Sequence, residues 1–194
     1  MRLFVAAYPP EGAVADLAAF VSGLRVGRAA AAGVNTRLAR PETYHLTLAF
    51  LGDVPDERLA DVEAAVSRAV DRVKPPVPEV ALAGGGRFGR GAFTLMWVGV
   101  TGDLDPMRAL HKVLRSSLKR ARLPYDDRPW KPHLTLARPG DRVPRADVDA
   151  DRAELNAYEG PRWPVRELLL MRSHLGPSPT YDRLTNWSLA GSLR

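Results

Sequence analysis

The segment His-Leu-Thr-Leu-Ala occurs twice in the sequence, beginning at His45 and at His133, 88 positions apart. Each copy is preceded by a strand pattern, a helix pattern and a loop, and is followed by a second helix pattern and a strand pattern. Self-similarity at a fixed offset indicates an internal duplication. We therefore expect two related halves arranged about a pseudo-twofold axis.

Hydrophobic periodicity and turn residues predict the elements of each half. The first half is predicted to contain a strand over 3–8, a helix over 14–24, a loop over 25–44, a strand over 45–51, a helix from Pro55, and a strand over 79–83 that runs into a glycine cluster. The second half is predicted to contain strands over 93–100, 133–138, 166–175 and 181–189, a helix over 103–121, a loop over 122–132 and a short helix near 146–155. Helices among antiparallel-looking strands, without regular βαβ alternation, favour an α+β fold.

Length and composition place the chain among ordinary globular proteins. With 194 residues, 45% hydrophobic and 26% charged, we expect one two-lobed domain over residues 1–194. No apolar run approaches the roughly 20 residues that span a bilayer, and Pro9 and Pro10 interrupt the apolar start before a signal-peptide core forms. We therefore expect a cytoplasmic protein without a membrane partner, working as a monomer.

The charge is strongly basic and is carried by arginine. The net charge is +6, and only four of the 28 basic residues are lysines. The planar arginine fork suits bidentate contacts with phosphate, so a polyanionic partner is one interpretation. A compositional bias toward arginine and alanine explains the excess equally well.

In each repeated segment, one face is expected to pack in the core and the other to face a functional site. Side chains alternate faces along a strand, so His45 shares a face with Thr47, and His133 shares a face with Thr135. If the halves pack about a twofold axis, the two imidazoles meet in one cleft. Strict alternation places Arg138 on the face opposite His133 unless the strand ends or twists there.

Two histidines flanking one phosphorus atom satisfy the needs of phosphodiester cleavage. In-line attack requires a base at the entering oxygen and an acid at the leaving oxygen. An unperturbed pKa near ~6.5 lets one ring be neutral while the other is protonated. For a single histidine on a strand, a packing role is the better interpretation. Because five identical residues recur at matching points of two repeats, a catalytic role is the better interpretation for the pair. His111 and His174 lack this context and are interpreted as surface or packing residues.

Other binding signals are weaker. The cysteine count is zero, which excludes disulfides and Cys-based zinc sites, and neither motif histidine has a second ligand at a usual metal spacing, so no metal or cofactor is expected. The glycine segment 84–89 matches G-x-G-x-x-G, but it leads into a predicted strand and not a helix, so we reject a dinucleotide site. Phe88 either stacks on a nucleobase, with Arg87 or Arg90 at backbone phosphate, or packs in a turn. For Trp130, nucleotide contact and packing stay equally open.

The chain resembles the two-histidine phosphoesterases, and among them the bacterial and archaeal RNA 2′,3′-cyclic phosphodiesterases, once called 2′-5′ RNA ligases. The resemblance covers nearly the whole chain: an opening strand RLFVA from Arg2, a first motif HLTLAFLG from His45, a second motif PHLTLAR ending at Arg138, and a matching spacing of apolar residues between Leu170 and Leu189. It implies a two-lobed α+β fold whose antiparallel sheets line a central cleft, with the helices outside.

The same resemblance implies the chemistry: metal-independent hydrolysis of a 2′,3′-cyclic phosphate end of RNA to a 2′-phosphomonoester, with weak reverse 2′-5′ ligation. By analogy His45 is the proton donor, His133 the proton acceptor, and Thr47, Thr135 and Arg138 contact the phosphate. Two alternatives stay open. One is a non-catalytic RNA- or nucleotide-binding module, and the other a phosphodiesterase for small cyclic nucleotides or 2′-5′ oligonucleotides.

Overall fold

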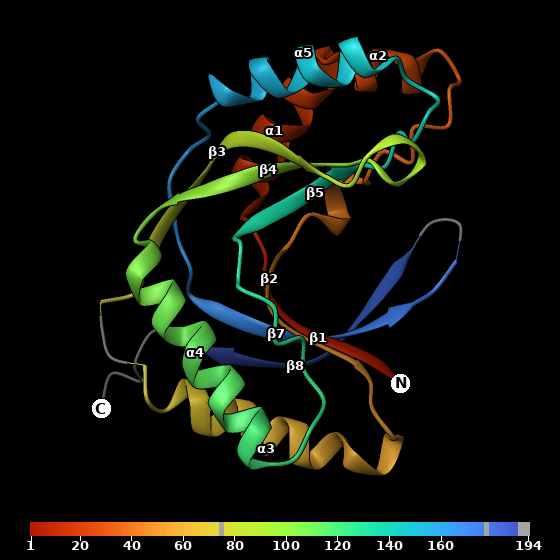
Figure 1. Ribbon diagram of the computed structural model, residues 1–194. Helices are drawn as coiled ribbons and strands as arrows, with labels where there is room; N and C mark the ends of the chain where they lie inside the picture. The colour runs from red at the N-terminus through yellow and green to blue at the C-terminus, as the bar shows by residue number, and fades with distance from the viewer. Residues whose placement is uncertain (74–75, 177–178, 190–194) are drawn as a thin grey trace.

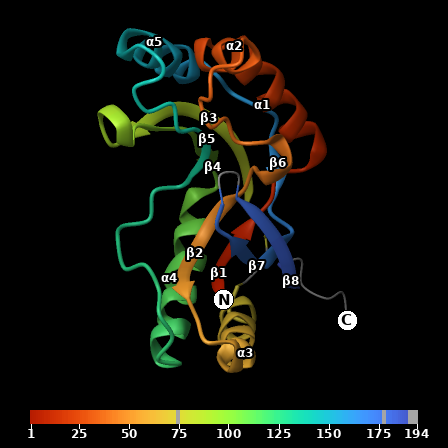
Figure 2. The ribbon, with the colours of Figure 1, turned by 90° about the vertical axis from the view of Figure 1, so that its right-hand side faces the viewer.

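Two antiparallel sheets of four strands each lie face to face in the computed structural model, which describes residues 1–73, 76–176 and 179–189. The first sheet has the order β2 (Leu46–Asp53), β1 (Arg2–Ala7), β7 (Glu167–His174), β8 (Thr180–Ser188), and the second the order β5 (His133–Ala137), β4 (Leu95–Gly102), β3 (Glu79–Phe88), β6 (Trp163–Pro164). Figures 1 and 2 show helices α3 (Leu59–Val70) and α4 (Leu104–Arg120) outside the first sheet, and α1 (Glu11–Gly23), α2 (Arg25–Ala31) and α5 (Arg145–Asn156) outside the second. The predicted α+β class, with its pair of sheets and outer helices, is confirmed.

The two halves of the sequence are interleaved in space. Strand β1 from the first half pairs with β7 from the second, while β4 from the second half pairs with β3 from the first. The helices follow the same rule, because α1 lies against the sheet of the second half and α4 against the sheet of the first (Figure 1). Each lobe therefore contains elements of both repeats.

Both repeated segments lie on edge strands, β2 and β5, and each edge is covered by the loop that precedes the other segment. The amide of Asp126 donates to the carbonyl of Phe50 on β2 at 2.8 Å, and the amide of Ala39 donates to the carbonyl of Leu136 on β5 at 2.7 Å. Covered edges cannot pair with a further strand. This reciprocal crossing of loops holds the two motif strands next to each other.

The motif leucines form part of the core between each sheet and its helices. Leu46, Leu48, Leu134 and Leu136 are all at most 1% exposed, whereas the histidines and threonines between them are partly exposed. The predicted division of each segment into a core face and a site face is therefore confirmed.

The prediction of a loop over 25–44 is wrong at its start and at Pro41–Thr43, where the chain forms helix α2 and a short 3-10 turn. Helix α1 ends because Leu24 is extended, and α2 begins directly after it. The carboxylate of Asp151 on α5 accepts hydrogen bonds from the backbone amides of Arg25 and Val26, both at 2.8 Å. A helix N-terminus needs such an acceptor, and here it comes from about 126 positions away, out of reach of local sequence patterns.

The glycine cluster is part of strand β3, and not a break after residue 83. Glycine is needed at Gly86 because a Cβ there would lie 2.0 Å from the indole of Trp97, and at Gly85 because it would lie 2.3 Å from the Cβ of Leu155 on α5. The segment then passes through a 3-10 turn, η3 (Gly91–Phe93), into β4. These glycines allow close packing of a ring and a helix, and the segment leads into a strand and not into a helix, as predicted.

Among the helices of the described ranges, none combines the length and the apolar character that a membrane crossing requires.

Candidate active site

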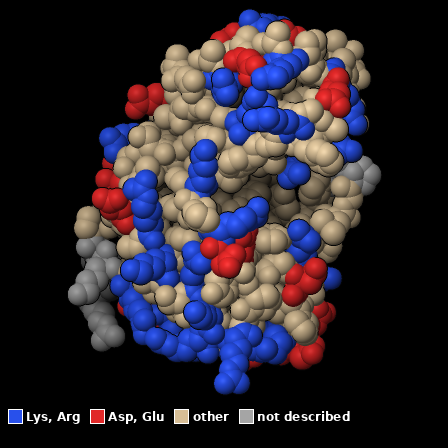
Figure 3. All heavy atoms as spheres, in the orientation of Figure 1, with Lys and Arg blue, Asp and Glu red and all other residues tan. Residues whose placement is uncertain are grey.

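A cavity of about 500 Å³ lies between the two sheets and is lined by four of the five predicted site residues, His45, Thr47, Thr135 and Arg138. Figure 3 shows the surface hollowed between the lobes, with basic side chains around the hollow. His133 is not part of this lining, but it lies close enough for its charge to act on His45. The structure thus brings the polar residues of both repeats to one place.

A β-bulge explains why Arg138 faces the cavity against strict alternation. On β5, Thr135 pairs with Trp97 and Ala137 pairs with Met96, so Leu136 is an extra residue without a partner on β4. One extra residue shifts the alternation by one position. Arg138, just beyond the end of the strand, therefore shares the face of His133 and Thr135, which is the exception that the alternation argument allowed for a strand that ends or twists there.

The first repeat contains the same bulge at the matching position. Thr47 pairs with Ala6 and Ala49 pairs with Val5, which leaves Leu48 unpaired on β2. The residue that corresponds to Arg138 is then Phe50, which pairs with Phe4 on the inner side of the sheet. The duplication has kept the backbone irregularity but not the charge.

Both motif rings are held by the same local hydrogen bond. The Nδ1 of His45 lies 2.7 Å from the carbonyl oxygen of Thr43, and the Nδ1 of His133 lies 2.7 Å from that of Lys131. A carbonyl only accepts, so each Nδ1 carries a proton and donates it. Each ring therefore offers its Nε2 for chemistry, as an acceptor when neutral and as a donor when protonated.

His45 sits in an aromatic wall. Its ring centroid lies 4.8 Å from that of Phe4, 5.6 Å from that of Tyr8 and 5.2 Å from that of Tyr181. Burial lowers the pKa of His45, the hydrogen bond to Thr43 opposes this effect, and the charge of His133 lowers the pKa further. This environment favours the neutral ring until a negative charge enters the cavity.

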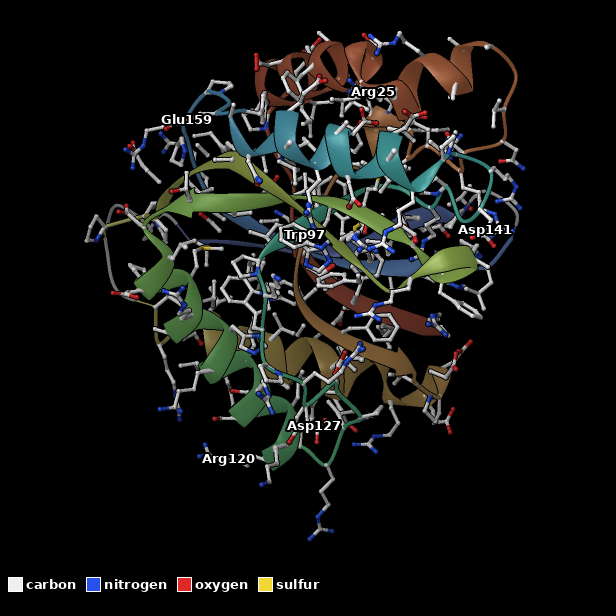
Figure 4. All side chains as sticks on the ribbon, turned by 45° about the horizontal axis from the view of Figure 1, so that its top comes forward. Arg25, Trp97, Arg120, Asp127, Asp141 and Glu159 are labelled. Carbon is white, nitrogen blue, oxygen red and sulfur yellow. The ribbon has the colours of Figure 1, made fainter. Side chains whose placement is uncertain are left out.

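His133 has both aromatic and cationic neighbours. Its ring lies 5.0 Å from that of Phe88 and 5.9 Å from that of Trp97, which lies between the sheets in Figure 4. The ammonium of Lys131 lies over the same two rings, 4.4 Å from the centroid of Trp97. Burial lowers the pKa of His133, the hydrogen bond to Lys131 opposes this, and the charge of Lys131 lowers it again.

The other two histidines take no part in the cavity. His111 is half-buried on α4, where its Nδ1 donates to the carbonyl of Leu48 at 2.7 Å, and the Nε2 of His174 lies 2.6 Å from the carboxylate of Asp182 near the surface. Trp130 packs against His111 with ring centroids 5.3 Å apart and donates from Nε1 to the carbonyl of Thr47 at 2.9 Å. Trp130 thus has a packing role.

Sequence reasoning missed Arg37 and Tyr181, which line the cavity. Lys131, which lies beside His133, belongs to the loop before the second motif, whose composition suits a nucleotide end. Arg37 has a left-handed backbone (φ 48°), which is costly for a residue with a Cβ, and its amide donates to the side chain of Asn35 at 3.2 Å. The signal for Lys131 was its place two residues before the second motif. Nothing in the local pattern marks Arg37, whose position depends on the loop lying along β5.

In the part of the chain that the structure describes, no group of three or more His, Asp or Glu side chains gathers where it could hold a metal ion.

A match to a known family of sequences shows which proteins this chain is related to. Residues 13–177 match the sequence profile of the 2′-5′ RNA ligase superfamily. The chain belongs to this superfamily. A relative from Thermus thermophilus named RNA 2′,3′-cyclic phosphodiesterase is 32% identical, over 98% of this chain and 91% of the relative. One from Escherichia coli with the same name is 30% identical, over 76% of this chain and 77% of the relative.

Two solved structures share the fold of this chain. A crystal structure of a Thermus thermophilus protein superposes with a TM-score of 0.75 at 30% identity, covering 99% of this chain and all of the other. Escherichia coli LigT, solved in complex with 3′-AMP, gives a TM-score of 0.66 at 25% identity, covering 97% and 98% of the two chains. The resemblance read from the two motifs is thus confirmed over the whole fold.

Proposed function

We propose that this protein is an RNA 2′,3′-cyclic phosphodiesterase, which opens the cyclic phosphate at an RNA end to a 2′-phosphomonoester with a pair of histidines and without a metal. The observation that carries the proposal is the equal fixing of two imidazoles, one from each repeat, by Nδ1 bonds to backbone carbonyls. The names of the relatives agree with it.

In the proposed reaction, the Nε2 of His133 takes a proton from water as its oxygen attacks phosphorus. The bond from phosphorus to the 3′-oxygen breaks, and the Nε2 of His45 gives that oxygen its proton. Thr47 and Thr135 donate hydroxyl hydrogen bonds to phosphoryl oxygens, and Arg138 supplies fixed positive charge. The negative phosphate raises the pKa of His45, which charges the ring when substrate is bound. When the 5′-hydroxyl of a second RNA attacks phosphorus in place of water, the same groups support weak 2′-5′ ligation.

The proposal is tested by incubating a 2′,3′-cyclic-ended oligonucleotide with the protein in EDTA and identifying the product. We expect a 2′-phosphate end. Tight binding without turnover would instead favour an RNA-binding module, and a 3′-phosphate product would show that the bond to the 2′-oxygen breaks, which contradicts the proposed reaction.

A single domain over residues 1–194, a monomeric state and a cytoplasmic location remain predictions from the sequence. Limited proteolysis, light scattering after size-exclusion chromatography, and cell fractionation test the three in turn.

A further inference from the structure

A second cavity of about 620 Å³ adjoins the first and shares Arg37 and Arg138 with it. Its remaining wall includes Phe88, Phe93 and Arg142. The volume lies within the range of small-ligand pockets. Because the shared arginines stand between the two cavities, a chain that occupies the first can continue into the second.

The charge of the second cavity suits a phosphate backbone. Arg37, Arg138 and Arg142 bring three guanidinium groups, and Asp141 is its single acidic lining residue. In the described part of the chain, none of the three arginines has a carboxylate within ion-pair distance, whereas Arg25, Arg58 and Arg128 all do. Unpaired guanidinium groups bind phosphate without first losing an internal partner.

The rim of the second cavity carries an unusually exposed aromatic ring. Phe93 in η3 is 86% exposed at the tip of the β3–β4 hairpin, so the face of its ring is open to a base that enters the cavity. Two contacts hold the tip in place. The amide of Phe93 donates to the carbonyl of Arg90 at 3.1 Å. Gly140 packs against Ala92 so closely that a Cβ on Gly140 would lie 3.2 Å from the carbonyl oxygen of Ala92. Figure 4 shows Asp141 beside this hairpin.

An exposed aromatic ring next to unpaired arginines is the combination that binds single-stranded nucleic acid, with bases on the ring and phosphates on the cations. We propose that the second cavity is a subsite for the nucleotide on the 5′ side of the cyclic end, whose base stacks on Phe93 and whose phosphate pairs with Arg142. This inference rests on the proposed function and narrows the substrate to oligonucleotides of at least two residues, in preference to free cyclic nucleotides.

The test compares kcat/KM for a 2′,3′-cyclic mononucleotide with that for cyclic-ended di- and trinucleotides of the same terminal base. We expect a rise of about tenfold or more from one to two nucleotides and little further gain at three. Phe93→Ala and Arg142→Gln should each remove most of that rise and leave the mononucleotide rate unchanged, while Phe93→Trp retains it. The control Arg108→Gln removes an exposed arginine of α4 and should change neither rate.

Equal rates on mono- and dinucleotide, or an equal loss on both in Phe93→Ala, would overturn the subsite and leave the proposed function standing. If no substrate is turned over, the proposed function fails. The subsite is then judged by calorimetric affinities for 2′-phosphate-ended mono- and dinucleotides, where equal values in the wild type contradict it.

Discussion

The two repeats share a backbone but differ in their charge. Each motif strand has a bulge at its second leucine, and each motif ring donates from Nδ1 to the carbonyl two residues earlier. Around these common features, the His45 side presents Phe50 and the His133 side presents Arg138 at matching positions. The duplication supplies the same backbone geometry twice, and the two copies differ in the residue after the bulge and in Lys131, which lies beside His133 alone.

That difference bears on the roles of the two rings. Lys131 stabilises the neutral form of His133 by lowering its pKa, as a base requires, whereas aromatic rings surround His45. The charge of Lys131 thus agrees with His133 as acceptor, whereas the donor role proposed for His45 depends on the bound phosphate raising the pKa of that ring. The experiments compare a substitution in one repeat with the matching substitution in the other.

The largest effect is expected from removing either ring. His45→Ala and His133→Ala should each lower kcat by roughly 10²–10⁴, because each removes a proton-transfer group. A cyclic substrate with sulfur in place of the 3′-bridging oxygen separates their roles, since a thiolate leaves without protonation. Its hydrolysis should be restored in His45→Ala and stay slow in His133→Ala. Equal rescue of both variants would show that the repeats are functionally interchangeable.

The next effect separates the residues that follow the bulges. Arg138→Gln should lower kcat by about 10²-fold, because it removes a charged donor from the phosphate. Phe50→Leu, at the matching position, should leave kcat within a few-fold and cost about 1 kcal/mol of stability through altered packing. Steady-state kinetics and urea unfolding of the two variants measure both quantities. A loss of rate in Phe50→Leu as large as in Arg138→Gln would contradict the asymmetry.

The sequence predicted the features that occur in both repeats, and it missed the features that depend on contacts between residues far apart in the chain. The motif strands, their buried leucines and the approach of the two halves follow from a pattern present twice. The direction of Arg138 does not, because the bulge at Leu136 exists only relative to β4. Helix α2 escaped prediction for the same reason, since its N-terminal amides bond to Asp151 on α5. Arg37 lines the cavity because its loop lies along β5, and no local sequence pattern predicts that position.

A smaller and more specific effect concerns pH. Since Lys131 lowers the pKa of His133, Lys131→Met should raise that pKa and move the acidic limb of the kcat/KM profile to higher pH. Lys131→Arg keeps the charge and should leave the limb near its wild-type place. Added salt should narrow the gap between wild type and Lys131→Met, because it screens the ammonium. A shift of the basic limb alone would mean that His45, and not His133, is the base.

The smallest effect is expected from the hydrogen bonds that hold the two motif strands, because these bonds differ between the repeats. At the bulges, the carbonyl of Leu136 accepts from the backbone amide of Ala39, whereas that of Leu48 accepts from the side chain of His111, and Trp130 bonds the neighbouring carbonyl of Thr47. Side-chain bracing can be removed without altering the chain path. Trp130→Phe should keep the stacking on His111, lose one hydrogen bond and cost about 1 kcal/mol.

For a chain of this size that cost lowers Tm by roughly 2–4 °C, which calorimetry resolves. Activity at 25 °C should stay within a few-fold, since the ring that holds His111 in place remains. Trp130→Ala serves as the comparison, because it removes the stacking as well and should lower Tm further. If Trp130→Phe left Tm unchanged but abolished turnover, the indole would act on the substrate, and its assignment to packing would be wrong.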